Sequence, residues 1–271
     1  MIVFPNSKIN LGLHITRKRS DGFHDLETVF YPLSFTDVLE IIESPAPNDI
    51  SFTASGIPVA GDPENNLCVK AYRLLKKDYP GLPPILMHLH KVIPMGAGLG
   101  GGSADGAYAL KLLNDKFQLG LSTDQLMKYA LQLGSDCPFF ITGKPCFATG
   151  RGEILASLSI DLSYYTFVLV NPGIHVNTAH AFSQITPALP GKSIKAIIQQ
   201  PVTTWKDELK NDFEEVVAKQ HPEISQIKEE LYAKGAVYAS MSGSGSTVYG
   251  IFEKGKELKW SFTTDYFIKQ L

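Results

Sequence analysis

Cysteine is scarce in this chain of 271 residues: it has three, and no two of them are separated by two residues. That number and spacing argue against a disulfide framework and against the usual structural zinc sites. We therefore expect Cys68, Cys137 and Cys146 to be reduced thiols, and we expect no metal site. An excess of one charge is also lacking, because 25 basic and 27 acidic residues leave a net charge of −2. A chain without a cationic field is not expected to bind nucleic acid as its main partner.

Long hydrophobic runs are absent as well. Apolar stretches such as residues 164–170 are far too short to span a bilayer. The first residues show no basic segment followed by a long apolar one, which a signal peptide would need. These features predict a cytoplasmic protein that does not bind membranes. Apolar residues make up 44% of the chain and charged residues 19%, a normal globular mixture whose length allows one large domain or two ordinary ones.

The pattern of apolar residues predicts strands and helices in both halves of the chain. Strands are expected at residues 6–15, 23–33, 38–42, 50–53, 85–89, 165–170, 237–241 and 247–252. Helices are expected at residues 66–77, 104–114, 122–134, 178–182, 207–219 and 223–234. Residues 187–201, bounded by prolines, are expected to form a surface connection. A change of pattern near residues 155–163 indicates a domain boundary there.

The most informative segment is glycine-rich and covers residues 94–106, which read PMGAGLGGGSADG. Six glycines fall in its last eleven positions, after a predicted strand and before a predicted helix. Glycine is entropically costly in ordered backbone, so such a cluster indicates a place where side chains would obstruct something. The usual object that needs bare backbone N–H groups at the start of a helix is a phosphate.

Two common types of glycine-rich phosphate loop fit this segment poorly. Gly96, Gly98 and Gly101 match the dinucleotide-binding pattern, but that pattern belongs at the end of the first strand, with an acidic residue about 20 positions later on a strand. Here the residue at that distance, Asp124, lies in a predicted helix cap. A Walker A loop needs lysine where Gly102 stands. A flexible linker or tight turn would not need a serine and a good helix former directly behind it.

The loop resembles the ATP-binding loop of the GHMP kinases, the family of galactokinase, homoserine kinase and mevalonate kinase. Residues 6–11 and 17–26 resemble the N-terminal signature of one branch, whose substrate is a CDP-linked methylerythritol of the non-mevalonate route to isoprenoid precursors. Residues 242–247 resemble the third motif of the family. The match extends over nearly the whole chain, and its order and spacing make it more specific than any single motif.

This resemblance implies an α+β, two-domain GHMP kinase fold. Residues 1–158 would form an ATP-binding and catalytic α/β domain of the ribosomal-protein-S5-domain-2-like type, and residues 159–271 a ferredoxin-like substrate-binding domain. It implies ATP and Mg²⁺ as cofactors, phosphorylation of the 2-hydroxyl of a small CDP-linked polyol, and a monomer or weak homodimer. The alternatives are another small-molecule kinase of this family, of the homoserine or mevalonate type, or a non-catalytic nucleotide-binding module on the same fold.

For the reaction, the resemblance implies Asp136 as the base and Lys8 as its positively charged partner. The positive charge would keep the carboxylate ionised and stabilise an alkoxide-like oxygen. From the sequence alone, an aspartate after a helix is more often a cap or turn former, and a lysine beside a strand is more often a solvated charge.

For ATP, the expected residues are those of the loop, with Asn65 near the adenine. They are Pro94, Met95, Gly96, Ala97, Gly98, Leu99, Gly100, Gly101, Gly102, Ser103 and Ala104. Backbone N–H groups and the dipole of the following helix would hold the β- and γ-phosphates. Ser103 could add a hydroxyl to a phosphate or to a water on Mg²⁺.

For the second substrate, the resemblance implies that Phe23 and Phe182 sandwich a cytosine, with His24 reading its edge and Asn10 holding the substrate. Further expected contacts come from Thr178, Ser242, Gly243 and Ser244. The alternatives are ordinary core positions for the two phenylalanines, a simple hairpin turn at residues 21–22, and a glycine hairpin at residues 242–246.

The chain departs from the family pattern at four places: Phe23 in place of tyrosine, Ala104, Gly106 and Cys137. No departure removes a charged group.

Overall fold

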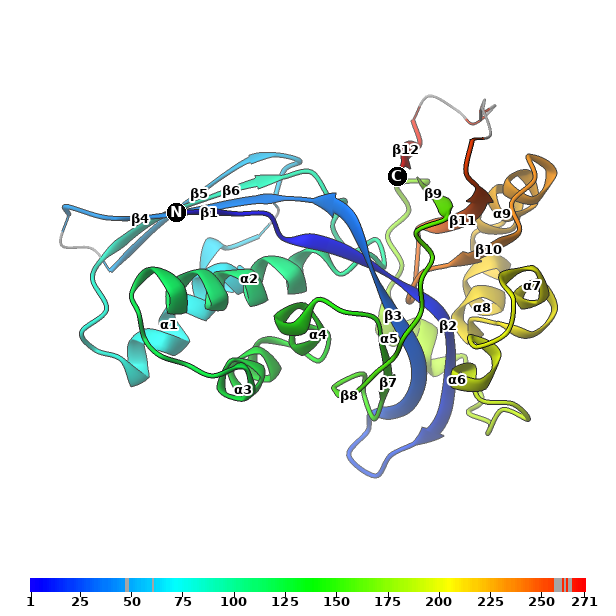
Figure 1. The fold of residues 1–271 in the computed structure, drawn as a ribbon, viewed down its shortest axis with the longest axis horizontal. Helices are drawn as coiled ribbons and strands as arrows, with labels where there is room; N and C mark the ends of the chain where they lie inside the picture. Colours follow the sequence, from blue (N-terminus) through cyan, green and yellow to red (C-terminus); the bar gives the residue numbers. More distant parts are fainter. Residues whose placement is uncertain (47–48, 60, 256–259, 261, 263–264) are drawn as a thin grey trace. The chain divides into compact units, whose positions relative to one another are not determined.

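The computed structural model describes residues 1–46, 49–59, 61–255, 260, 262 and 265–271 (Figure 1). Its contacts divide the chain into two compact units. Unit 1 holds residues 1–8, 32–95 and 100–144, and unit 2 holds residues 9–31, 96–99 and 145–271. The division therefore does not follow chain order, because an N-terminal hairpin and four residues of the glycine loop group with the C-terminal half. The boundary expected at residues 158/159 stays a prediction.

Unit 1 is built on a four-stranded sheet of order β1–β4–β6–β5. The strands are β1 (Ile2–Val3), β4 (Val38–Glu43), β5 (Ile50–Gly56) and β6 (Ile85–Lys91). Strand β6 runs antiparallel to β4 and parallel to β5. Its side chains alternate as expected: Ile85, Met87 and Leu89 are buried, and residues 86 and 90 are exposed.

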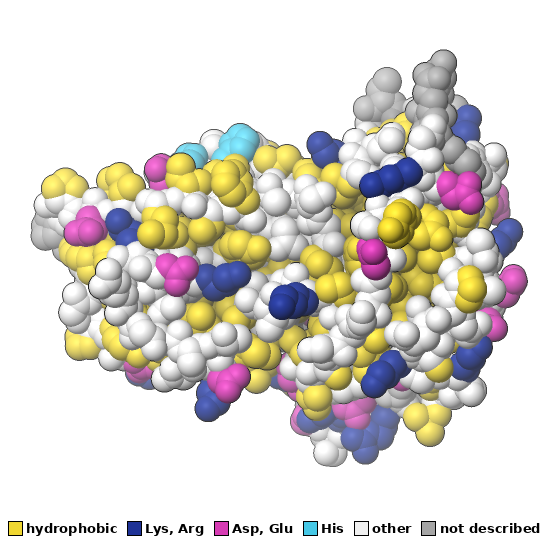
Figure 2. Space-filling model, viewed as in Figure 1, with side chains coloured by type: hydrophobic (Ala, Val, Ile, Leu, Met, Phe, Trp, Pro, Cys, Tyr) yellow, Lys and Arg dark blue, Asp and Glu magenta, His cyan; other side chains and the backbone are white. Residues whose placement is uncertain are grey.

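The described residues of unit 1 also form four α-helices: α1 (Leu67–Asp78), α2 (Gly101–Lys116), α3 (Thr123–Leu133) and α4 (Cys137–Thr142). Helix α1 packs on α2, and both lie on the inner face of the sheet (Figure 1). The outer face carries exposed apolar side chains such as Ile42 and Leu86, and Figure 2 shows hydrophobic side chains at the surface over these strands.

The ends of these helices follow from local chemistry. The Asn66 side chain accepts the backbone N–H of Cys68 and so begins α1. Ser122 and Gln125 form the reciprocal capping box that the sequence predicts at the start of α3, and Gly134 ends that helix. A short 3₁₀ helix, Pro63–Asn65, precedes α1. The expected helices at residues 66–77 and 122–134 are therefore confirmed.

Two further sheets belong largely to unit 2. One has the order β2–β3–β7–β8, with β2 (Asn6–Lys18), β3 (His24–Thr36), β7 (Cys146–Thr149) and β8 (Ile154–Ser157). Strands β2 and β3 each have one end in unit 1. The other has the order β10–β11–β9–β12, with β9 (Tyr165–Asn171), β10 (Tyr238–Met241), β11 (Val248–Glu253) and β12 (Phe267–Gln270), all antiparallel.

The helical elements of unit 2 are short. They are α5 (Thr178–Ser183), α6 (Ile194–Ile197), the 3₁₀ helix Val202–Thr204, α7 (Trp205–Glu208), α8 (Asp212–Gln220) and α9 (Glu223–Ala233). Helix α9 packs on β10 and β11 through Ile224, Ile227 and Leu231, which are fully buried. This apolar layer forms the core of unit 2.

Three expectations from the sequence are wrong. The helix expected at residues 207–219 is two helices, because Asn211 caps α8 and donates from its side chain to the carbonyls of Met241 and Gly243. The connection expected at residues 187–201 contains α6, whose Ile194 and Ile197 are buried rather than at the surface. Helix α2 begins three residues before the expected position, inside the glycine run.

The three cysteines are free thiols, as expected, and all three are also buried. Within the described part of the chain, no helix is both long and apolar enough to cross a bilayer.

Candidate active site

The glycine loop is shaped by backbone that only glycine adopts readily. Gly96, Gly98 and Gly100 have φ of 62°, 77° and 70°. A Cβ on Gly98 would lie 2.0 Å from the carbonyl oxygen of Ser242, so that position has no room for a side chain. Gly100 occupies the N-cap position of α2, and no side chain there accepts a bond from the first turn. The N–H groups of that turn are therefore not blocked by a side-chain cap, as a phosphate site needs.

Gly102 differs from its neighbours, because a Cβ there would meet no atom within 4 Å. It borders a cavity of about 370 Å³ within unit 1. The cavity is also lined by Asn65 and Met95, two of the residues expected to bind ATP. Its remaining lining residues are Phe52, Ala54, Val59, Gly61, Asp62, Pro63, Asn66, Leu67, Leu89, Lys91 and Asp105.

Lys8 and Asp136, the expected catalytic pair, form an ion pair within unit 1. The Lys8 Nζ lies 3.5 Å from Asp136 Oδ2, and their side chains are 4% and 33% exposed. Asp136 stands at the N-cap position of α4 but makes no side-chain cap bond, so capping is not its role. The Lys8 chain runs beside Gly100, since a Cβ on Gly100 would lie 3.1 Å from two Lys8 carbons. The pair is thus adjacent to the start of α2.

Burial lowers the pKa of the Lys8 ammonium, and the neighbouring Asp136 carboxylate opposes this shift. Lys8 is therefore not the solvated surface charge that its sequence context suggested. Its position resembles that of lysines which stabilise a developing negative charge in a water-poor site.

The serine-glycine turn at residues 242–246 contacts the glycine loop within unit 2. The Ser242 hydroxyl donates to the carbonyl of Gly98 at 2.7 Å and accepts the N–H of Asn10 at 3.2 Å. The N–H of Thr247 donates to the carbonyl of Ala97 at 3.2 Å. Segments from three distant parts of the sequence therefore meet at residues 97–98. Asn10 is buried and donates to the hydroxyl of Thr28.

The aromatic residues expected to hold cytosine are near one another in unit 2, but in another arrangement than a Phe23–Phe182 sandwich. The His24 ring stacks on Phe182, with centroids 4.9 Å apart and planes 14° apart. Phe213 meets the Phe182 ring edge-on, with centroids 4.8 Å apart. Phe23 is about half exposed, and the Arg151 guanidinium lies 4.8 Å from its ring centroid. Thr178 and Ser244, from the same set, share a hydroxyl–hydroxyl hydrogen bond of 2.9 Å.

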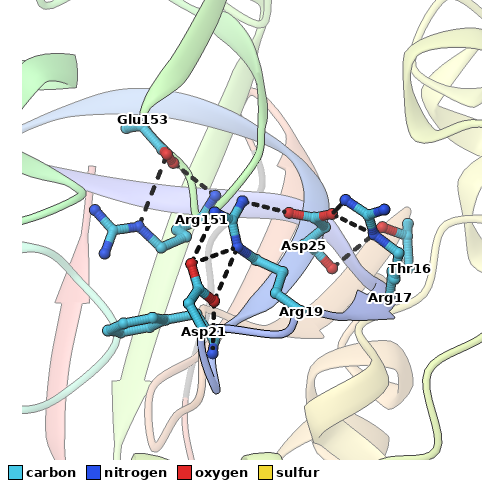
Figure 3. A network of polar contacts seen from close by, with 8 residues as sticks. Thr16, Arg17, Arg19, Asp21, Asp25, Arg151 and Glu153 are labelled. Atoms are coloured by element: carbon cyan, nitrogen blue, oxygen red, sulfur yellow. Dashed lines mark hydrogen bonds and ion pairs between the residues drawn. The ribbon is translucent and has the colours of Figure 1, made fainter.

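A charged network surrounds the β2–β3 hairpin next to Phe23 (Figure 3). Arg19 pairs with Asp21 and Asp25, and the N–H of Phe23 donates to Asp21. Glu153 accepts the backbone N–H of Arg151 and faces its side chain, with 3.7 Å between Nε and Oε1. The hairpin at residues 21–22 is thus held by charge pairs, a feature that the sequence motif alone did not reveal.

Sequence reasoning also missed a buried group of charges next to the cavity: Asp37, Lys91 and Asp105. The available signal was weak, a lysine that ends an alternating strand and two isolated aspartates. The distances along the chain between bonded partners are 54 and 14 residues, so no local pattern connects them.

Comparison with known proteins identifies the family to which this fold belongs. The family model for the GHMP kinase N-terminal domain matches residues 66–144, and the model for the C-terminal domain matches residues 193–259. A mevalonate kinase structure from Methanococcus jannaschii superposes with a TM-score of 0.69 at 13% identity, covering 94% of this chain and 91% of its own. The fold and the glycine loop together define a GHMP kinase.

Relatives of higher sequence identity indicate which branch of the GHMP kinases the chain belongs to. The 4-diphosphocytidyl-2-C-methyl-D-erythritol kinase of Bacteroides thetaiotaomicron is 56% identical over 254 residues, covering 93% of this chain and 92% of its own. The Bacteroides fragilis kinase of the same name is 53% identical, covering 95% and 94%. A crystal structure of 4-(cytidine 5'-diphospho)-2C-methyl-D-erythritol kinase superposes with a TM-score of 0.80 at 30% identity, covering 93% and 90%. The chain belongs to the 4-diphosphocytidyl-2-C-methyl-D-erythritol kinase family, and it is accordingly an ATP-using phosphotransferase.

Proposed function

We propose that this chain transfers the γ-phosphoryl group of Mg–ATP to the 2-hydroxyl of 4-diphosphocytidyl-2-C-methyl-D-erythritol. The observation that carries the proposal is the Lys8–Asp136 ion pair beside Gly100, where the phosphate loop enters α2. It supplies a carboxylate and a buried positive charge, the two groups that transfer to an alcohol requires in addition to a phosphate cradle.

Each side chain has a defined task in this reaction. Asp136, one-third exposed, accepts the proton of the attacking hydroxyl while the oxygen of that hydroxyl bonds to the γ-phosphorus. The bond from that phosphorus to the β–γ bridging oxygen breaks, and ADP leaves with the electron pair. Lys8, held in a buried position, stabilises the negative charge on the attacking oxygen. The N–H groups at the start of α2 face the transferred group's oxygens.

Mg²⁺ enters as part of the nucleotide substrate. Among the described residues, no group of three or more His, Cys, Asp or Glu side chains is placed to hold a metal ion. In nucleotide-binding enzymes Mg²⁺ is usually held by substrate phosphates with one or two carboxylates.

The cytidyl end of the substrate is assigned to residues of unit 2, with Phe23, His24 and Phe182 as the aromatic set. Stacking requires only an aromatic face, so Phe23 can serve in place of the tyrosine that the resemblance leads one to expect. Because His24 now lies against Phe182, entry of a base between aromatic rings at this place requires the His24 ring to move.

The proposal is tested by coupling ADP release to a spectrophotometric readout with the CDP-linked alcohol, homoserine and mevalonate as separate acceptors. We expect turnover with the first only, and a new phosphomonoester signal in the ³¹P NMR spectrum of its product. Saturable binding of CDP should accompany it. Turnover with homoserine or mevalonate but not with the CDP-linked alcohol would assign the chain another substrate. ATP binding without turnover on any acceptor would contradict a catalytic role.

A further inference from the structure

Asp37, Lys91 and Asp105 form a cluster of charged side chains in unit 1 that are almost fully shielded from water. The Lys91 ammonium at the end of β6 donates to Asp105 of α2 at 2.7 Å and to Asp37, which lies between β3 and β4. Their side chains are 0 to 4% exposed. Charges are rarely buried to this degree, and exchanging such a group for apolar side chains is often neutral or stabilising. Stability alone is therefore a weak reason for its presence.

The group is hydrogen-bonded to the backbone just before the glycine loop and lies close to the backbone where the loop enters α2. Before the loop, Asp37 Oδ1 accepts the backbone N–H groups of Val92 and Ile93 at 2.6 and 2.8 Å. After the loop, the Lys91 ammonium lies beneath the first residue of α2, only 2.9 Å from where a Cβ on Gly101 would stand. A change in this group's charge or geometry would therefore reach the loop from both sides.

Two of its members, Lys91 and Asp105, also line the cavity of about 370 Å³ that contains Asn65 and Gly102. The charged group thus borders the space in which the proposed function puts the nucleotide.

The three charges do not balance. Two carboxylates face one ammonium, and Asp105 Oδ1 is buried with no hydrogen-bond partner. One proton on Asp105 would remove the excess negative charge. Burial, reinforced by the Asp37 carboxylate and opposed by Lys91, raises the pKa of Asp105 to about 7. From α1, Cys68 also faces the group, but burial raises the pKa of its thiol well above the usual value, so it stays neutral.

We propose that Asp37, Lys91 and Asp105 position the glycine loop for ATP and that nucleotide binding is coupled to uptake of a proton by Asp105. The inference rests on the proposed function, because it requires ATP at this loop. The polyphosphate is an anion, and its approach penalises the deprotonated group more than the neutral one.

The sign of the coupling follows from linkage. If the anion raises the pKa of Asp105 in the bound state, binding takes up protons, and affinity for ATP falls as pH rises through neutrality. A single group can change the affinity by at most about tenfold per pH unit. We expect a rise in KM for ATP of several-fold between pH 6 and pH 8.

The test compares the wild type with Asp105→Asn and with Asp115→Asn, a matched control on an exposed position of the same helix. KM for ATP is measured from pH 6 to 8 with the acceptor saturating. The wild type and Asp115→Asn should show the several-fold rise, whereas Asp105→Asn, which cannot lose that proton, should show a smaller one. ATP's own titration is common to all three and cancels in the comparison.

Equal pH dependence of KM in the wild type and Asp105→Asn would overturn the inference. Should Asp105→Asn fail to fold, calorimetry on the wild type decides. Titration with a non-hydrolysable Mg–ATP analogue at pH 7, in buffers of different ionisation enthalpy, should show net proton uptake, and a value near zero would overturn the coupling. Absence of wild-type turnover would instead count against the proposed function.

Discussion

The substitution Asp136→Asn examines the proposed chemistry most directly, because it keeps the shape of the side chain and removes its basicity. A positioned base contributes about 10²- to 10⁴-fold to a proton-transfer step, so we expect kcat to fall by that factor. KM for ATP should change little, since Asp136 is paired with Lys8 rather than with a loop N–H. ADP release in a coupled assay measures both constants.

The same substitution has a stability cost that the structure allows to be estimated. Lys8 is 4% exposed and 3.5 Å from the carboxylate. Removing the charge of one partner while the amide keeps its hydrogen-bonding atoms costs about 1–3 kcal/mol, toward the lower end here because Asp136 is one-third exposed and screened. A loss of this size lowers Tm by a few degrees, about 2–4 °C per kcal/mol for a chain of this size. The variant should therefore remain folded at assay temperature.

Lys8→Met provides the partner experiment. If Lys8 and Asp136 act as a unit, the double variant should be no slower than the worse single variant, because groups that act together are strongly non-additive. A kcat for Asp136→Asn within about tenfold of the wild type would refute Asp136 as the base. Full additivity of the two substitutions would refute joint action.

Three further substitutions test the assignments of individual residues. Phe182→Ala should raise KM for the CDP-linked alcohol by about 5- to 150-fold, as expected from loss of about 1–3 kcal/mol of base stacking, with KM for ATP unchanged; an unchanged acceptor KM removes Phe182 from the pocket. Gly98→Ala should lower the free energy of unfolding, measured in thermal melts, by at least the roughly 3 kcal/mol that strained backbone can cost, because φ is 77° and the added Cβ also meets the Ser242 backbone. Gly191→Ala, with open space around it, is the neutral control. Gly102→Ala should leave Tm unchanged or raise it slightly yet raise KM for ATP, and an unchanged KM would mean that no phosphate approaches this residue.

The fold could be predicted from the sequence where one local pattern dominates. The Ser122 capping box and the alternation along residues 85–89 both have their expected structures. The break at Asn211 could not be predicted, because its side chain bonds to Met241 and Gly243, about 30 residues later. The burial of Ile194 and Ile197 was hidden by the prolines that bound their segment. In both cases distant contacts outweighed local propensity.

The candidate site could likewise be predicted only in part from the sequence. Lys8 and Asp136 were found through the family's motifs, and the structure brings them within 3.5 Å of each other. Nothing local in the sequence indicated that Lys8 would be buried or that His24 would stack on Phe182. The position of Arg151 over Phe23 could not be predicted either. Arg151 lies between β7 and β8, and it is brought to Phe23 by pairing between distant segments, including a bond from the N–H of Leu26 to the carbonyl of Gly150.

Glycine is needed at different positions of the loop for two different physical reasons, although the glycines form one run in the sequence. Gly98 and Gly100 are required by the protein itself, because a Cβ would strike the Ser242 backbone at the first and Phe140 at 2.8 Å at the second. Gly102 faces open space and the cavity, so an external group accounts for it better than packing does. The loop has no lysine, and Lys8, packed beside Gly100, supplies a buried positive charge there. Because Gly100 has no side chain, Lys8 of β2 can approach the start of α2. Lys8 thereby places a positive charge where a lysine of the loop would otherwise be needed.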